Sequence, residues 1–118
     1  MKRLMLAAPA RGSGKTVLTC GLLAALTARG IGAEAFKCGP DYIDPMFHQK
    51  VLGVPSRNLD LFLQGEGGVR RTLAKQSRPV ALIEGAMGYY DGVNGTEQAS
   101  AWHLATAAKL PVVLAVRP

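Results

Sequence analysis

The chain has 118 residues, 48% of them hydrophobic, and a formal net charge of +6; this length permits one domain at most, and the apolar content suffices for a buried core. The basic residues are scattered, apart from one group at 70–78 on the expected solvent face of a helix, and no aromatic residues alternate with them, which argues against a nucleic-acid-binding surface. The apolar run near the amino terminus is short and ends at Pro9, which excludes a signal peptide and a membrane span.

The first expected strand, residues 4–8, runs into a glycine-rich loop and then into a helix over about 15–29. The loop carries the phosphate-binding sequence Gly12-Ser13-Gly14-Lys15-Thr16. Glycines in such a loop let successive backbone N–H groups face phosphate oxygens, while the lysine reaches the terminal phosphates and the hydroxyl ligates magnesium. We therefore predict that a nucleoside triphosphate and Mg²⁺ bind here, although Pro9 stands where the first glycine of the pattern usually lies.

Three more apolar runs are expected to be strands, at residues 33–37, 80–83 and 112–116. Helices are expected between them at about 67–76 and 99–109, each ending before a proline. Apolar strands that alternate with helices predict an α/β fold of the phosphate-loop NTPase type, with a mostly parallel sheet and helices on both faces. Ligands of such a sheet bind beyond the carboxyl ends of its strands.

The second strand leads into the most unusual part of the sequence, the run Phe36-Lys37-Cys38-Gly39-Pro40-Asp41-Tyr42-Ile43-Asp44-Pro45. Its prolines stiffen a loop that carries the carboxylates of Asp41 and Asp44, both expected at the carboxyl edge of the sheet. Lys37 ends the strand and is expected to neutralise phosphate or an acidic substrate. Asp44 has an alternative role as the cap of a helix that begins at Pro45.

The third strand ends in a carboxylate, Glu84. We predict that this acid binds magnesium directly or through water, because carboxylates beside a triphosphate need a cation between them. The alternative is a solvated loop acid. Asp60 is likewise expected in a loop after a strand, and the pattern leaves open which of Asp41, Asp44 and Asp60 ligates the metal.

Residues 89–95 are glycine-rich and polar, and they are expected to form either a loop that closes on the substrate or an ordinary surface turn. His48, Trp102 and His103 lack partners at catalytic or metal spacing, and packing is expected for the last two. The two cysteines form no metal-ligand spacing and, with no export signal, indicate reduced thiols in a cytoplasmic protein. The sequence therefore indicates binding of phosphate and magnesium and positioning of a substrate. It shows no arrangement typical of a catalytic nucleophile.

Four segments together resemble the amino-terminal domain of cobyrinic acid a,c-diamide synthases: residues 12–16, 36–45, 55–60 and 83–92. The resemblance extends through residue 116 and so covers nearly the whole chain. It implies an ATP-dependent amidoligase of cobalamin biosynthesis. Such enzymes use ATP and Mg²⁺ to phosphorylate the c and then the a carboxylate of a corrinoid. Ammonia, released from glutamine by a glutaminase domain, then displaces the phosphate to leave an amide.

The resemblance also implies roles for individual residues. ATP would be held by Gly12, Ser13, Gly14, Lys15, Thr16 and Lys37. The metal ligands would be Thr16, Asp44 and Glu84, and catalysis would depend on these two acids together with Asp41 and Lys15. The corrinoid would lie near Tyr42 and Asp91. A substrate carboxylate is already ionised, so no strong general base is required.

The length of the sequence departs from the family pattern. We expect residues 1–118 to be the amino-terminal part of an ATP-binding synthetase domain, truncated or split, with the glutaminase domain beyond Pro118 or on a partner subunit. Neither Cys20 nor Cys38 has the context to replace the glutaminase nucleophile. The expected partners are a corrinoid and the glutaminase, with no nucleic acid and no membrane, and a homodimer is left open.

Two alternatives remain at this stage. A related tetrapyrrole amidase or a dethiobiotin synthetase would have the same broad fold and would also activate a carboxylate. A partitioning or regulatory ATPase, which works as a nucleotide-switched binding module, belongs to a different class. Such ATPases usually carry an extra lysine early in the loop, where this sequence has Ala10, and this difference argues against that class.

Overall fold

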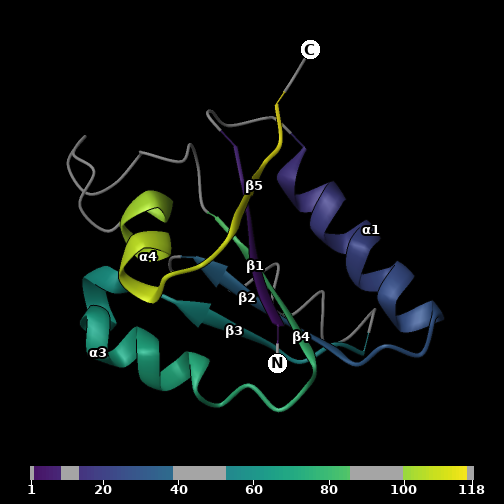
Figure 1. Ribbon diagram of the computed structural model, residues 1–118, viewed down its shortest axis with the longest axis horizontal. Coiled ribbons are helices and arrows are strands. Elements are labelled where there is room, and N and C mark those ends of the chain that lie inside the picture. Colours follow the sequence, from purple (N-terminus) through teal and green to yellow (C-terminus); the bar gives the residue numbers. More distant parts are fainter. Residues whose placement is uncertain (1, 9–13, 39–52, 86–99, 117–118) are drawn as a thin grey trace.

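The computed structural model describes residues 2–8, 14–38, 53–85 and 100–116. In chain order these contain β1 (Lys2–Ala7), α1 (Lys15–Ala28), β2 (Ala33–Cys38), β3 (Ser56–Leu59), α3 (Leu61–Leu73), β4 (Val80–Glu84), α4 (Ala101–Ala108) and β5 (Val112–Leu114). The strands form one sheet in the order β3-β2-β4-β1-β5, and each pair of neighbours is parallel (Figure 1). The predicted α/β fold with a parallel sheet is therefore confirmed. Within the described ranges, no helix is long and apolar enough to cross a membrane.

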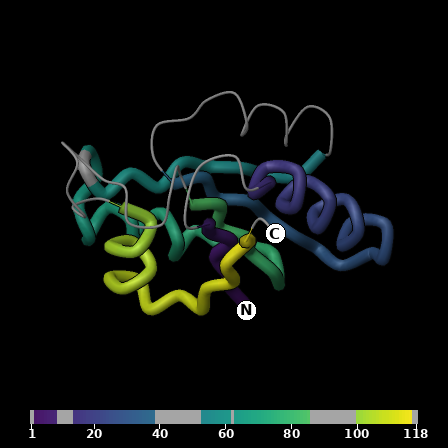
Figure 2. Tube along the Cα trace, turned by 90° about the horizontal axis from the view of Figure 1, so that it is seen from above, coloured from purple at the N-terminus to yellow at the C-terminus, as the bar shows by residue number. Residues whose placement is uncertain are grey.

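Helices cover both faces of this sheet, as predicted, with α1 and α4 on opposite sides (Figure 2). Under α1 lies a small buried cluster of Leu23, Ala33, Ala35, Val54 and Leu82. Under α3 and α4 lies a larger one, which includes Met5, Phe36, Leu59, Ile83 and Leu104. Successive strand residues point to opposite faces of a sheet, so the apolar run of one strand fills both clusters.

The strand β3 and the first half of α3 were not predicted. Three of the four residues of β3 are polar, and only Leu59 carries the apolar signal of a buried strand. The helix was expected to begin at about 67, but it begins at Leu61 and is interrupted at Gly65, whose φ of 68° is the left-handed conformation that favours glycine. Its start is stabilised by Asp60, whose Oδ1 accepts the N–H of Leu63 at 3.3 Å.

A buried carboxylate, Glu34, fixes the amino-terminal edge of the sheet. It is 2% exposed and accepts the backbone N–H groups of Ser77 and Arg78, the latter at 2.7 Å. Arg78 in turn donates to the carbonyl of Ala33 at 3.2 Å. These contacts tie the turn before β4 to the start of β2. They support the register in which Lys37 pairs with Glu84 at the other end of the same two strands.

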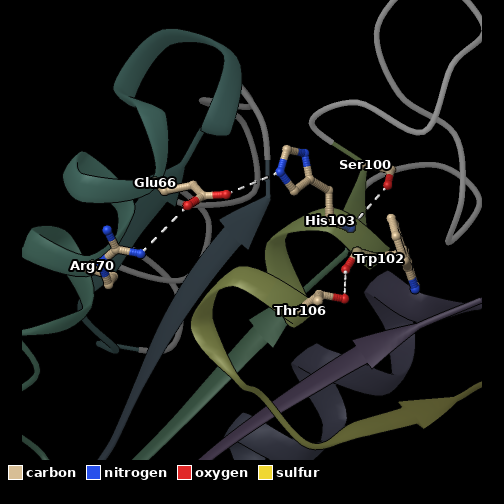
Figure 3. Close-up of polar contacts among 6 residues, drawn as sticks. All are labelled: Glu66, Arg70, Ser100, Trp102, His103 and Thr106. Carbon is tan, nitrogen blue, oxygen red and sulfur yellow. Dashed lines mark hydrogen bonds and ion pairs between the residues drawn. The ribbon is translucent and has the colours of Figure 1, made fainter.

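The contact between α3 and α4 includes exposed polar groups (Figure 3). Glu66 lies between His103, whose Nε2 is 3.4 Å from Oε1, and Arg70, whose Nη1 is 3.8 Å from Oε2. The predicted packing role of His103 is therefore supplemented by a contact with an acid on the neighbouring helix. Ser100 begins α4 as its cap, because its Oγ accepts the N–H of His103 at 3.1 Å. Since Glu66 is half-exposed, its contacts with Arg70 and His103 add little stability.

Candidate functional site

The start of α1 lies at the carboxyl edge of the sheet, where the phosphate loop was predicted. Gly14 precedes the helix with φ 81° and ψ 18°, a left-handed conformation that strains any residue with a Cβ atom. Lys15 is buried at the first helical position, and Thr16 follows it. The first turn of α1 contains no acidic residue, so no side chain of that turn neutralises the positive end of the helix dipole.

Three polar residues form a row across the sheet close to this helix start. Lys37 of β2 pairs in register with Glu84 of β4 on one side and with Asn58 of β3 on the other. Paired residues of neighbouring parallel strands project from the same face. That face is the one covered by α1, because Thr16 of α1 contacts Glu84.

Glu84 is the centre of the site. Its Oε1 accepts a hydrogen bond from the Thr16 hydroxyl at 2.8 Å, and its Oε2 lies 2.9 Å from the Lys37 ammonium. The side chains of Glu84 and Lys37 are only 1% and 9% exposed, so the charges are removed from water together. The alternative that Glu84 is a solvated loop acid is therefore wrong.

The oxygen atoms of Thr16 and Glu84 fit a magnesium site. A hydroxyl and a carboxylate are the hard oxygen donors that Mg²⁺ prefers, and Mg²⁺ characteristically takes one or two protein groups with the rest of its ligands from phosphate and water. Glu84 Oε2 is buried and accepts no well-aligned hydrogen bond, which leaves a lone pair for a cation. In the described part of the chain, no group of three or more His, Cys, Asp or Glu side chains could hold a metal by itself.

Other predicted site residues have different positions. Asp60 is one of the three acids considered as a metal ligand, and it is buried and caps α3. Its backbone N–H donates to Gln64 Oε1 at 3.0 Å. The remaining ones lie outside the described residues: Gly12, Ser13, Asp41, Tyr42, Asp44 and Asp91. The structure thus brings Thr16, Lys37 and Glu84 into contact, and the roles predicted for all of these residues stay predictions.

The place of Asn58 in the row and the packing of α4 against Gly85 were not predicted from the sequence, which indicated only that Gly85 lets the backbone pass close to a phosphate. Asn58 belongs to the row, yet its segment was noticed only as part of a family resemblance, because β3 lacks an apolar pattern. Gly85 follows Glu84, and a Cβ atom there would come within 3.0 Å of the Ala101 side chain. The close approach of α4 therefore favours glycine directly after the acid, and a Glu-Gly pair at a strand end is a signal of such an approach.

Comparison with known proteins shows that the chain is similar to one group of enzymes. The chain is 48% identical over 118 residues to the cobyrinate a,c-diamide synthase of Clostridium acetobutylicum, with 100% of this chain and 27% of the relative covered. It is 48% identical over 116 residues to the cobyrinate a,c-diamide synthase of Gloeobacter violaceus, with 96% and 26% covered. It is 47% identical over 117 residues to the hydrogenobyrinate a,c-diamide synthase of Streptomyces coelicolor, with 97% and 24% covered.

These identities confirm the resemblance predicted from the four sequence segments. No protein-family model matches the chain. The chain spans about a quarter of the length of the curated relatives it matches.

Proposed function

We propose that this chain is the nucleotide-binding part of an ATP-dependent enzyme that converts the a and c carboxylates of a corrinoid into amides. The contact of Glu84 with both Thr16 and Lys37 carries the proposal. This contact brings together the start of a helix that follows a phosphate-binding sequence, a buried carboxylate and a cationic side chain. These three groups are the ones needed to bind a magnesium triphosphate. The 48% identity to a cobyrinate a,c-diamide synthase supports the substrate class.

The proposed reaction has two steps. An oxygen of the substrate carboxylate bonds to the γ-phosphorus of ATP, the bond from that phosphorus to the β,γ-bridging oxygen breaks, and ADP leaves. The nitrogen of ammonia then bonds to the carbonyl carbon of the acyl phosphate, loses one proton to solvent or to the departing phosphate, and the bond from that carbon to the phosphate oxygen breaks, which releases inorganic phosphate. Glutamine supplies the ammonia through a glutaminase in another part of the protein or on a partner.

The described residues would contribute positioning and charge. Thr16 and Glu84 would hold Mg²⁺, which when bound neutralises negative charge on the phosphates. Lys15 and Lys37 would offset the charge of the triphosphate or of the substrate carboxylate. Because the carboxylate is ionised at neutral pH, it attacks without a general base, and the work of the protein is alignment.

Hydrogenobyrinate is a second candidate substrate. The hydrogenobyrinate a,c-diamide synthase of Streptomyces coelicolor is 47% identical to this chain, which is close to the 48% of the cobyrinate relative. The identities therefore favour neither substrate.

The test is amide formation by the full-length protein. It would be incubated with ATP, Mg²⁺ and glutamine and with either cobyrinate or hydrogenobyrinate, and the products would be resolved by mass spectrometry. We expect two successive conversions of a carboxyl into a carboxamide on one of these substrates, each dependent on ATP. Normal binding of Mg·ATP without amide formation on either substrate would refute the substrate class.

A further inference from the structure

Lys37 stands between two oxygen acceptors on neighbouring strands. Its register partners are Glu84 of β4 and Asn58 of β3. Neighbouring strands are about 4.8 Å apart, and a lysine stem is long and flexible enough to reach a residue directly opposite on either side. The ammonium can therefore serve one acceptor or the other without a change in the backbone.

The two acceptors are in different states. Glu84 Oε2 lies 2.9 Å from the Lys37 ammonium. Asn58 Oδ1 is buried and has no hydrogen-bond partner in the described structure. A buried carbonyl oxygen without a donor is unfavourable and unusual in folded proteins, and it calls for an explanation.

We infer that Lys37 is the resident counter-cation of Glu84, and that a divalent metal at Glu84 displaces it onto Asn58 Oδ1. The inference rests on the proposed function, because it needs a metal at Glu84. A buried carboxylate without a partner is costly, so the ion pair protects Glu84 while the metal is absent. Two cations on one buried carboxylate repel each other, so the metal replaces the ammonium, and Asn58 then gains the donor that it lacks.

In this exchange, the ammonium of Lys37 competes with the metal for the carboxylate of Glu84. A metal alone must displace Lys37, whereas a metal that arrives with a triphosphate also brings negative charge for the ammonium to face. The site would therefore favour the metal–nucleotide complex over the free ion. The charge of Lys37 also stays at the carboxyl edge of the sheet, close to the expected phosphates.

The experiment measures binding of Mn²⁺ alone, in place of Mg²⁺, to the full-length protein by electron paramagnetic resonance titration of free Mn²⁺. Lys37→Met removes the competitor, and we expect roughly tenfold tighter Mn²⁺ binding, since one unit charge next to the ion is lost. Asn58→Leu removes the second acceptor, and we expect Mn²⁺ binding to weaken roughly three- to tenfold because the displaced ammonium has no partner.

Two control variants match these changes. Lys75→Met removes the same charge from an exposed turn, and Ser56→Ala alters a buried residue of β3 two positions before Asn58. Both should titrate with Mn²⁺ as the wild type does. Thermal unfolding without metal should show a lower melting temperature for Lys37→Met and little change for Asn58→Leu.

The outcomes separate this inference from the proposed function. If the wild type binds Mg·ATP but Lys37→Met binds Mn²⁺ no more tightly than the wild type, or Asn58→Leu binds it equally well, the inference is overturned and the proposed function stands. If the wild type binds neither Mn²⁺ nor Mg·ATP, the proposed function fails and the inference fails with it. If Lys37→Met does not fold, Asn58→Leu decides alone.

Discussion

At the scale of single residues, Glu84 connects the start of α1 to the sheet. Its two oxygens meet a hydroxyl from α1 and an ammonium from β2, and almost none of its surface reaches water. An acid in this position is retained either for stability or for chemistry. Buried ion pairs are weak sources of stability, because desolvation offsets most of their attraction. Chemistry is therefore the better explanation for a buried carboxylate at the end of a strand.

Replacing Glu84 by glutamine tests this explanation. Glu84→Gln keeps the shape and an acceptor for Thr16, but it removes the charge that a metal needs. We expect ATP-dependent turnover of the full-length protein to fall by roughly 10²- to 10³-fold, as for loss of one group that stabilises transition-state charge. We expect the free energy of unfolding to fall by about 3–5 kcal/mol, because the buried ammonium of Lys37 loses its counter-ion.

The matched control is Glu66→Gln. Glu66 is a half-exposed acid on α3, and its contacts are with Arg70 and His103 rather than with the residues of the site. It should leave both turnover and stability nearly unchanged. Unchanged turnover in Glu84→Gln would remove Glu84 from the metal site.

The Thr16 hydroxyl allows a second test with its own rescue. Thr16→Ala removes the donor to Glu84 and the expected metal ligand, so the Kd for Mg·ADP should rise about tenfold, while Thr16→Ser should bind nearly as the wild type does. Isothermal titration calorimetry measures both. Equal weakening by alanine and serine would point to the methyl group and would contradict the ligand role.

At the scale of elements, the packing of α4 against the end of β4 holds the acid in place. Gly85 donates its N–H to the carbonyl of Leu6 at 2.8 Å, and a Cβ atom on it would lie 3.0 Å from Ala101 Cβ. We expect Gly85→Ala to lower the free energy of unfolding by about 1–3 kcal/mol through overpacking. Chemical denaturation of the full-length protein measures this loss.

A double variant shows whether the helix contact is the cause. Adding Ala101→Gly to Gly85→Ala removes the clashing methyl group, so the two changes should be less damaging together than the sum of their separate effects. If the two changes in the free energy of unfolding are strictly additive, the loss of stability in Gly85→Ala comes from the backbone near Leu6 instead.

The sequence predicted those elements that have a strong local pattern. The apolar runs and the glycine-rich loop indicated β1, β2, β4, β5 and α1 within a few residues. It did not indicate β3, because Ser56, Arg57 and Asn58 read as a polar loop and become a strand only through pairing with β2. It also missed the start of α3, since three glycines at 65–68 conceal a helix that Asp60 caps.

At the scale of the whole molecule, the sheet order creates the site. Lys37 and Glu84 are 47 residues apart in the sequence (84 − 37), and they meet because β2 and β4 are neighbours. Strand-end residues could be predicted to share one edge, since parallel strands end together. Which strands are adjacent depends on packing across the sheet, so neither the Lys37–Glu84 pair nor the place of Asn58 followed from local pattern.

The central claim is that this fold activates a substrate carboxylate by phosphorylation. The most direct measurement uses cobyrinate or hydrogenobyrinate with oxygen-18 in the a and c carboxylates, incubated with the full-length protein, Mg·ATP and glutamine. If an acyl phosphate forms, each amide produced transfers one labelled oxygen to inorganic phosphate, which mass spectrometry of the phosphate detects. Amide formation with unlabelled phosphate would contradict the claim.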